Sequence, residues 1–451
     1  MTQIRIGSDQ WAFIVDALAD DRGRERMAFL LCGRNRHSAE ERLLCHEVIP
    51  VDEAAYQISR ATMLAVDPIY VNSVLNSAER GGWSVVMVHN HPGATRAAFS
   101  AADDHGEERL FPLLTGRMSD RIHGAMVIAG EHAAFRTWRA GARNPEPGTV
   151  VVLGRADESQ TTGPTDDESY LSREVLFLGS SVRQALSGLR VGIIGVGGTG
   201  SLVAQMLAHL HVGEIVLVDH DSLETSNLSR VVGSHTKDVG RPKVEIAARA
   251  IHQTSPLTRV NPIAKTVLSP EAIDSLLDVD FMFGCTDTHS SRLLLNQVAW
   301  QYLIPLLDLG ALIRIENHAP TFIGGAVRVV MPGHLCLICD QQIDSARITW
   351  ELKADEQQRL DRQFGYVPGF DAPEPAVITI NSIVAGLAST VFLNLIGAFM
   401  PAIEGQLVLD LVRPTLVRSR PGNNHRCEVC SPKGLVGSGD LASLPIYPRS
   451  V

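Results

Sequence analysis

Two histidines and an aspartate in the first quarter of the chain have the types and the spacing of a metal site. His89 and His91 stand two residues apart in "VMVHNHPGATRAAFSAADDH", directly before Pro92. At the end of a strand such residues project to the same side, so both imidazoles can reach one metal ion. Ser100 and Asp103, one helical turn apart, follow at a helix start that could supply a third ligand. Two histidines and one aspartate around Zn²⁺ leave a fourth position open for water, which is typical of hydrolytic sites rather than structural ones.

A glycine-rich segment marks a second candidate site. The apolar run in "RVGIIGVGGTGS" predicts a buried strand, and it is followed by Gly195, Gly197 and Gly200 in GxGxxG spacing, with Gly198 as a further glycine of the loop. Glycines let the backbone approach a phosphate, and the start of the next helix offers unpaired N–H groups to its charge. Asp219 ends the next apolar run, "EIVLVDHD", where a dinucleotide fold places an acidic residue. These features indicate a nucleotide site, and by themselves they fit an NAD-dependent oxidoreductase.

Charged residues near the glycines favour a reaction that splits a nucleoside triphosphate. The segment "VDHDSLETSNLSR" contains Asn227 and Arg230, and Lys243 follows in "GRPKVE". Asp287 follows the apolar run "VDFMFG", with Arg292 five residues later in "GCTDTHSSR". Hydride transfer needs no such set of residues. A reaction in which phosphates depart does need them, because cations must neutralise the charge of the phosphates and a carboxylate must hold Mg²⁺.

Four of the seven cysteines form two CxxC pairs, Cys336 with Cys339 and Cys427 with Cys430. This usage suits metal binding in a reducing compartment better than disulfides. The alternative, two unrelated thiol pairs, is disfavoured by their identical spacing.

The motifs GxGGxG, DxDxxExxNLxR and CTDxxxxR, with the lysine between the last two, resemble those of the ThiF/MoeB-type adenylating enzymes. This family includes the adenylation domains of ubiquitin-activating enzymes, and the match runs from about Tyr170 to Ser431. The resemblance implies a Rossmann-like domain with a mainly parallel sheet. It also implies binding of ATP and Mg²⁺, adenylation of the C-terminal glycine carboxylate of a ubiquitin-like protein, and a homodimer.

The resemblance also implies roles for individual residues. Asp219 and Asp221 would meet the ribose and Mg²⁺, and Asp287 would be the essential metal-binding carboxylate. The phosphates would be held by Asn227, Arg230 and Lys243. Arg173, in "YLSREVLF", matches an arginine that reaches the partner subunit's ATP site, although the leading arginine of the family's usual "RYxRQ" is missing here. The two CxxC pairs match the family's structural zinc site.

Ubiquitin-activating enzymes also carry a cysteine that accepts the activated protein as a thioester. The segment between the two CxxC pairs contains no cysteine, which leaves Cys32, Cys45 and Cys285. Cys285 follows an apolar strand and fits a packed small hydrophobe better than a nucleophile. We therefore expect the adenylate to pass to a thiol of another protein, either a ubiquitin-conjugating-like enzyme or a sulfur donor.

The opening pattern, HxHP, seven residues and SxxD, resembles the JAMM motif of JAB/MPN-type metallo-isopeptidases over residues of about 5 to 135. The resemblance implies that His89, His91 and Asp103 bind zinc and that Ser100 stabilises an oxyanion. It also implies a glutamate on an earlier strand as general base. Glu25 is the candidate, one residue further out than the family's pattern, and a β-bulge could restore it. Glu47 is the second candidate, and an inactive domain or surface histidines before a turn remain as alternatives.

The elements that must position these residues predict two α/β domains, because 451 residues are too many for one ordinary core. We expect a JAMM-like domain at 1–140, a linker at 141–169, the adenylation domain at 170–432 and a tail at 433–451. The linker prediction rests on "RAGARNPEPG" and on the polar, acidic "ADESQTTGPTDDES".

Composition limits the partners. The formal net charge of −10 argues against nucleic-acid binding. The start "MTQIRIGSDQWAF" has no signal-peptide pattern, so we expect a cytoplasmic protein. Residues 375–403 carry no charge, which predicts a helix buried in a domain core or a subunit interface, with a membrane span as the alternative.

The sequence thus predicts a zinc metalloprotease fused to an ATP-dependent adenylyltransferase, both acting on the tail of one ubiquitin-like protein. Such fusions resemble components of bacterial ubiquitin-like conjugation systems. Three alternatives remain. One is adenylation of a sulfur-carrier protein for cofactor or cysteine biosynthesis, another is a JAB domain that only docks the substrate, and the third is the NAD-dependent oxidoreductase.

Overall fold

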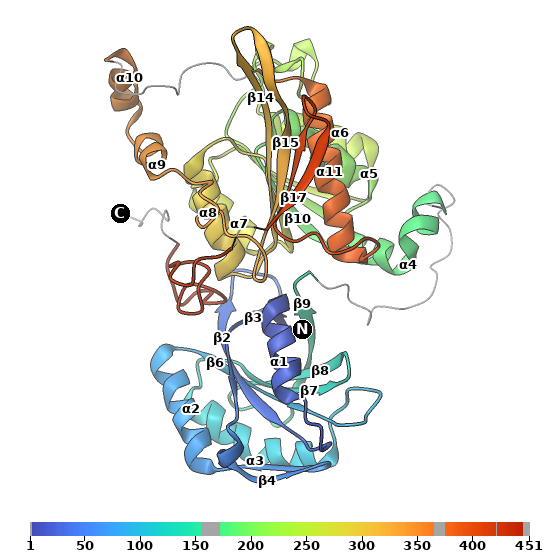
Figure 1. Cartoon of the computed structure of the whole chain (residues 1–451), viewed down its shortest axis with the longest axis vertical. Helices are drawn as coiled ribbons and strands as arrows, with labels where there is room; N and C mark the ends of the chain where they lie inside the picture. The colour runs from blue at the N-terminus through green and yellow to red at the C-terminus, as the bar shows by residue number, and fades with distance from the viewer. Residues whose placement is uncertain (1, 155–171, 365–374, 421, 445–451) are drawn as a thin grey trace. The chain divides into compact units, whose positions relative to one another are not determined.

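The computed structural model describes residues 2–154, 172–364, 375–420 and 422–444, and the chain divides into two compact units (Figure 1). The first comprises Met1–Gly154 with Trp300–Leu303 and Glu428–Ser443, and the second comprises the rest. Most of the expected linker, residues 155–169, lies outside the described residues, as does 445–451 of the expected tail.

The first unit is built around a closed barrel with the strand order β1-β3-β2-β6-β7-β8-β9. Alternate side chains of β2 enter two separate cores: Ala28 and Leu30 pack with residues of α1, and Phe29 and Leu31 pack with residues of α2 and α3. The β4–β5 hairpin forms a small sheet of its own. The elements are β1 (Thr2–Ile6), α1 (Ser8–Leu18), β2 (Met27–Asn35), β3 (Arg42–Pro50), η1 (Glu53–Ala55), β4 (Tyr56–Arg60), β5 (Met63–Val66), α2 (Pro68–Gly81), β6 (Ser84–Asn90), α3 (Ala101–Arg117), β7 (His123–Ala129), β8 (His132–Trp138) and β9 (Glu146–Val152).

The first unit extends beyond residue 140, where the sequence pattern placed its end. The apolar run of β9 closes the barrel by pairing with β1 and β8. Residues from the expected tail also join this unit: the Gly33 N–H donates to the Gly437 carbonyl at 3.1 Å, and the Asp440 N–H donates to the Arg34 carbonyl at 2.8 Å. Backbone pairing at the end of β2 therefore holds a segment that is remote in sequence.

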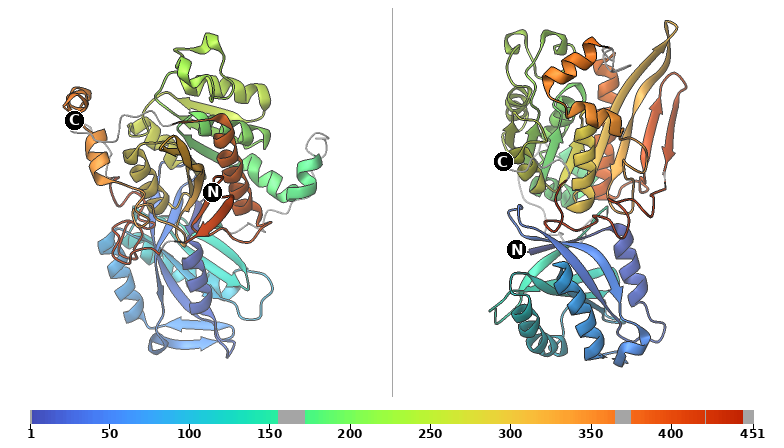
Figure 2. Two further views of the ribbon diagram at one scale, coloured as in Figure 1. Left: turned by 45° about the horizontal axis from the view of Figure 1, so that its top comes forward. Right: turned by 90° about the vertical axis from the view of Figure 1, so that its left-hand side faces the viewer.

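The second unit contains an eight-stranded sheet in the order β12-β11-β10-β13-β14-β15-β16-β17. Its first five strands are parallel and the remaining pairings are antiparallel, so the α/β prediction is confirmed. Figure 2 shows the long β14–β15 hairpin at the antiparallel side. The elements are α4 (Ser172–Gly188), β10 (Arg190–Ile194), α5 (Gly198–His209), β11 (Glu214–Val218), η4 (Thr225–Asn227), η5 (Thr236–Asp238), α6 (Lys243–Thr254), β12 (Arg259–Ile263), α7 (Pro270–Leu277), β13 (Phe281–Gly284), α8 (His289–Gln301), β14 (Leu306–Glu316), β15 (Ala319–Val330), α9 (Ser345–Glu351), α10 (Asp355–Gln363), α11 (Ile378–Gly397), β16 (Gln406–Asp410) and β17 (Thr415–Ser419).

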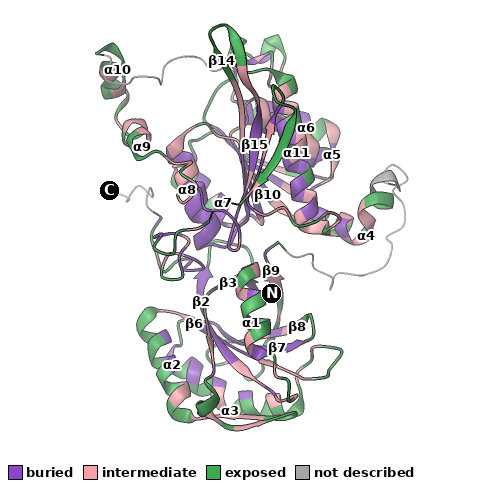
Figure 3. Cartoon of the chain, in the orientation of Figure 1, coloured by how far each residue is buried: buried purple, intermediate pink, exposed green. Residues whose placement is uncertain are grey.

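The uncharged stretch forms α11, which packs against α5, β14 and β15. Phe392 of this helix is fully buried and contacts Phe281 and Phe283 of β13. Among the described helices α11 alone has the length and apolarity of a membrane span, and core helices share both properties. Figure 3 shows that buried residues lie along the central strands, whereas β17 and the tip of the β14–β15 hairpin are exposed.

The strand order creates a topological switch point in this sheet. β10 has β11 on one side and β13 on the other, so the connections leave β10 and β13 in opposite directions. In open parallel sheets ligands bind outside the carboxyl ends of the strands at such a switch point. Gly195 follows β10 there, Asp219 follows β11, and Asp287 lies in the loop after β13.

Candidate functional site

The glycine loop between β10 and α5 is packed too closely for any other residue at two positions. Gly195 has φ +87°, and a Cβ on it would lie 2.6 Å from the Cys285 carbonyl oxygen. A Cβ on Gly200 would overlap the Gly195 carbonyl oxygen. Gly197 caps α5 and has no side chain to satisfy the first N–H groups of the helix, which start at Gly198. The loop therefore leaves helix N–H groups available to an anion.

Asp219 fixes this loop to the end of β11. Its carboxylate accepts hydrogen bonds from the Val196 N–H at 2.6 Å and from the Asp221 N–H at 2.8 Å, and the residue is only 9% exposed. The neighbouring Asp221 carboxylate is half exposed and accepts a hydrogen bond from Lys243 Nζ at 2.8 Å. Asp219, His220 and Asp221 have ligand atoms close enough to hold one metal ion. The end of β11 thus presents carboxylates and a buried ammonium side by side.

Arg230 lies beside the start of α5, and Asn227 stabilises the turn that precedes Arg230. Arg230 Nη1 donates to the Ser226 carbonyl at 2.9 Å, and Asn227 Oδ1 accepts from the Glu224 N–H at 3.2 Å. A Cβ on Gly198 would lie 3.3 Å from Arg230 Cδ, so the arginine side chain passes over the first residue of α5.

Asn381 is a site residue that sequence reasoning missed. It lies in the first turn of α11, is 5% exposed, and its Nδ2 would clash with a Cβ on Gly198. The signal was weak, since Asn381 is one of two buried amides in this uncharged helix, the other being Asn394. The sequence pattern did not show that α11 begins against α5.

Asp287 lies exposed in the loop after β13, two residues before α8 begins. The α8 N-terminus is already occupied, because the Glu351 carboxylate accepts from the His289 N–H at 2.9 Å and the Ser290 N–H at 2.7 Å. Arg292 Nε lies 3.2 Å from the buried carboxylate of Asp308. Burial, and then the charge of Asp308, raises the pKa of the Cys285 thiol, which disfavours the thiolate that a thioester would need.

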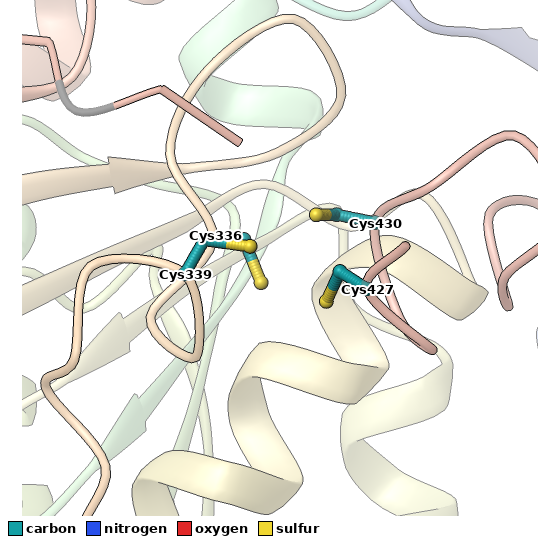
Figure 4. A group of neighbouring side chains, drawn as sticks. All are labelled: Cys336, Cys339, Cys427 and Cys430. Atoms are coloured by element: carbon teal, nitrogen blue, oxygen red, sulfur yellow. The ribbon is translucent and has the colours of Figure 1, made fainter. Parts of the chain in front are cut away.

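The two CxxC pairs come together in space (Figure 4). Their four sulfur atoms all lie within 4.8 Å of one another. Two amide groups donate to the sulfurs: Asn296 Nδ2 to Cys336 Sγ at 3.6 Å, and the Asn424 N–H to Cys339 Sγ at 3.3 Å. Donors of this kind favour thiolates, and four thiolates fit a closed, tetrahedral, structural Zn²⁺ site.

In the first unit, the structure brings His89, His91 and Asp103 together. His89 Nε2 lies 3.0 Å and His91 Nε2 lies 3.3 Å from the Asp103 carboxylate, and the two Nε2 atoms are 3.2 Å apart. Although burial opposes it, hydrogen bonds from His89 and Ser100 hold the pKa of Asp103 well below its usual range. Burial, and then the nearby His89, lowers the pKa of His91. A neutral imidazole and an ionised carboxylate are the forms that bind a metal, so the set fits Zn²⁺.

Ser100 caps α3. Its Oγ accepts from the Asp103 N–H at 3.2 Å, while the Asp103 carboxylate accepts from the Ser100 N–H at 2.6 Å. This reciprocal pair is a capping box, so the SxxD spacing has a local structural cause. It also fixes the carboxylate that faces the histidines.

Glu25 lies at the same end of the barrel as the histidines. Met27 pairs with His89 across β2 and β6, and Asn90 Oδ1 accepts from the Arg26 N–H at 2.6 Å. Glu25 itself is 8% exposed, and burial raises the pKa of its carboxyl against the opposing charge of His89. Glu47, the second candidate, is exposed on β3 opposite Leu31.

Residues 171–430, more than half of the chain, match the model of the ThiF family. The chain belongs to the ThiF family. Part of it is 34% identical over 165 residues to the SAMP-activating enzyme E1 of Haloferax volcanii, covering 36% of this chain and 61% of that protein. Part is 32% identical over 153 residues to the molybdopterin-synthase adenylyltransferase of Escherichia coli, covering 34% of this chain and 61% of that protein. This chain therefore spans about three fifths of the length of these curated relatives.

Solved structures with a similar fold include that of E. coli MccB, which is 22% identical to this chain. The match has a TM-score of 0.47 and covers 59% of this chain and 73% of MccB. The ThiF match contains the glycine loop and the switch point described above, and it begins after the histidine cluster. Arg173 lies within it on α4, with its side chain outside the described residues.

Proposed function

We propose that this ThiF-family protein adenylates the C-terminal glycine carboxylate of a ubiquitin-like protein and also carries a metallopeptidase for the same protein. The observation that carries the first half is the switch point. There, an uncapped helix start, two cations and the carboxylates at the end of β11 lie together, and Asp287 follows the neighbouring β13. The relatives named as activating an archaeal SAMP and as adenylyltransferases support this reaction.

In the proposed reaction a carboxylate oxygen of the glycine attacks the α-phosphorus of ATP. The new O–P bond forms as the bond to pyrophosphate breaks, so negative charge develops on the leaving phosphates. Lys243 and Arg230 would neutralise that charge, the start of α5 would bind the phosphates, and Asp221 with Asp287 would hold Mg²⁺. Asp219 would act through the backbone, because its carboxylate already holds the glycine loop. The adenylate would then pass to a thiol of a second protein, since Cys285 is a poor nucleophile where it lies.

The N-terminal unit would supply the peptidase. His89, His91 and Asp103 would hold Zn²⁺, which when bound polarises a scissile carbonyl and makes water acidic. Glu25 would accept the proton from that water, and burial, which raises the pKa of its carboxyl, makes it a stronger base. Ser100 would stabilise the developing oxyanion. A second Zn²⁺, held by the two CxxC pairs, would have a structural role.

Both activities would use the tail of the same ubiquitin-like protein. Because the two sites are in one chain, the product of one site is released at a high local concentration near the other site. The proposed partners are a ubiquitin-like protein with a C-terminal glycine, a ubiquitin-conjugating-like enzyme or a sulfur donor, and a second copy of this chain. We propose a cytoplasmic location and a bacterial ubiquitin-like conjugation system.

The test is the intact mass of a ubiquitin-like protein that carries residues beyond its glycine, after incubation with the whole chain. We expect loss of the extension without ATP, and a further gain of the mass of AMP with ATP and Mg²⁺. His89→Ala should remove only the trimming, and Asp287→Asn should remove only the gain of AMP. An Asp287→Asn variant that still adenylates would contradict the proposed Mg²⁺ site. Trimming that survives His89→Ala would leave the N-terminal unit as a docking module.

Sulfur-carrier adenylation is the second candidate, favoured by the relative named molybdopterin-synthase adenylyltransferase and by the missing thioester cysteine. The two candidates differ in the acceptor of the adenylate. Co-purification of a tagged wild-type chain with a conjugating-like enzyme would support ubiquitin-like conjugation. Co-purification with a sulfurtransferase would support sulfur-carrier adenylation.

A further inference from the structure

The N-terminal unit contains a cavity of about 440 Å³ that the proposed function does not use. Its wall includes four arginines and two carboxylates: Arg34, Arg36, Arg121, Arg139, Glu41 and Asp120. Arg34 and Arg36 lie at the C-terminal end of β2, whereas Met27, at its N-terminal end, pairs with His89. Nine residues of strand span about 30 Å, so the cavity and the histidine cluster lie at opposite ends of β2.

The ionisable groups in the wall do not balance. Four arginines against two carboxylates leave a formal charge of +2 on the wall itself, in a chain whose net charge is −10. Outside the wall, the Glu146 carboxylate lies 3.7 Å from Arg139 Nε. The Glu41 carboxylate is shared, because it lies 3.2 Å from Arg139 Nη1 and 3.8 Å from Arg34 Nη1. Asp120 is exposed and lies 3.3 Å from Arg121 Nε. The buried Arg34 donates a hydrogen bond to the Asp120 carbonyl at 2.7 Å, and the carboxylate that faces it, Glu41, is distant and shared.

Arg36 carries the excess charge. Within the part of the chain that the structure describes, its guanidinium makes no hydrogen bond or ion pair, and only its backbone N–H is bonded, to Asp440 at 3.0 Å. The crowding is visible in Arg34, whose pKa is lowered by burial and then by the charge of Arg36. Four arginines gathered around one cavity repel one another, and a bound anion would relieve this repulsion.

We propose that this cavity binds the phosphate group of a small molecule. A phosphate dianion matches the formal charge of the wall, and the planar guanidinium fork matches two phosphate oxygens at once. A cavity of this size also has room for a sugar or nucleoside beyond the phosphate. The Ser119 hydroxyl in the same wall adds a neutral donor. The phosphate could come from a nucleotide or from another phosphorylated metabolite, and both would present the same group to the arginines.

The test uses hydrogen exchange of the full chain, titrated separately with pyrophosphate, AMP and glucose 6-phosphate. Pyrophosphate and AMP would also bind the adenylation site, and exchange separates the two sites by peptide. We expect slower exchange in peptides covering 34–41 and 119–122. In Arg36→Ala/Arg139→Ala the dissociation constant at these peptides should rise at least tenfold. Both residues are exposed, so the fold should survive.

The matched control is Arg80→Ala/Arg109→Ala, which removes the same charge from exposed positions of α2 and α3 and should leave binding unchanged. Tighter binding of AMP than of glucose 6-phosphate would assign the phosphate to a nucleotide, and the reverse order to a sugar phosphate. The proposal is wrong if no probe protects these peptides at millimolar concentration. Unchanged protection in the double variant, or equal protection by succinate, would overturn it as well.

Discussion

At the scale of single residues, a carboxylate in each of the two candidate sites accepts hydrogen bonds from backbone amides. Asp219 accepts from Val196 and Asp221, and Asp103 accepts from Ser100 while it faces two histidines. Each carboxylate is therefore fixed before any ligand arrives, and its negative charge is stabilised in place. The sequence alone cannot distinguish two roles for Ser100 and Asp103, a helix cap and part of a metal site. The SxxD spacing of a capping box is also the spacing that brings Asp103 to the histidines.

Asn381 gives the first prediction. Its amide lies on Gly198, next to Arg230, where the phosphates are proposed to bind. We expect Asn381→Ala to lower kcat/KM for ATP–pyrophosphate exchange by roughly ten- to a hundredfold, because one charge-assisted hydrogen bond is worth roughly 1.5–3 kcal/mol. Asn381→Asp keeps the volume but places a negative charge beside the phosphates, and its loss should be larger.

Ser382→Ala is the control for Asn381, since its hydroxyl bonds the Ile378 carbonyl within α11. Equal rates for Asn381→Ala, Asn381→Asp and the wild-type chain would show that Asn381 only packs against the glycine loop.

At the scale of elements, the helix starts differ in what binds their first N–H groups. Ser100 caps α3, and the carboxylate of Glu351 occupies the start of α8. The start of α5 follows Gly197, which has no side chain. Of these three, α5 is therefore the helix whose N–H groups are available to phosphates. The GxGxxG spacing predicted this, whereas the Glu351 contact joins residues 61 and 62 positions apart and left no local pattern.

The pairing of β6 with β7 yields a prediction about pH. His123 is fully buried in β7, its Nδ1 accepts from the Val85 N–H at 3.1 Å, and burial lowers its pKa to about 4. Unfolding restores the ordinary value of 6.5, so the unfolded chain binds more protons between pH 6.5 and pH 4. The contribution of His123 to stability is thus complete above pH 6.5 and is lost as the pH falls toward 4. The slope is about 1.4 kcal/mol per pH unit within that window.

Urea unfolding between pH 7 and pH 4.5, followed by hydrogen exchange in β6 and β7 peptides, measures this slope. His123 Nε2 also lies 3.4 Å from the Met118 carbonyl oxygen. The amide of His123→Gln can keep this contact and the one to Val85 without titrating, so its unfolding free energy should fall less steeply with decreasing pH. His132→Gln, at an exposed position of β8, should behave as the wild-type chain does. Parallel curves for His123→Gln and wild type would contradict the assignment.

At the scale of the whole molecule, the sequence predicted what depends on local spacing and missed what depends on remote pairing. The GxGxxG loop, the α/β class and the family over 171–430 follow from periods and motifs that lie within a few dozen residues. The boundaries of the two units do not follow from such local patterns. β9 joins the barrel through β1 at the other end of the unit, and residues 428–443 join it through hydrogen bonds to Gly33 and Arg34. No local pattern encodes such partners.

The CxxC pairs provide the last prediction, because they join segments whose nearest cysteines, Cys339 and Cys427, are 88 positions apart. A metal that closes so long a loop removes conformational entropy from the unfolded chain, and its binding free energy adds to folding.

We expect two zinc ions per chain, one of which is lost in Cys427→Ser/Cys430→Ser and the other in His89→Ala. The cysteine variant should unfold on the order of 10 °C lower, for a loss of about 3–4 kcal/mol. His89→Ala should change the midpoint little, since its site joins strand and helix within one unit. Metal analysis of the purified chains alongside calorimetry separates the two sites. A cysteine variant with full zinc content and an unchanged midpoint would show that the four thiols meet without a structural metal.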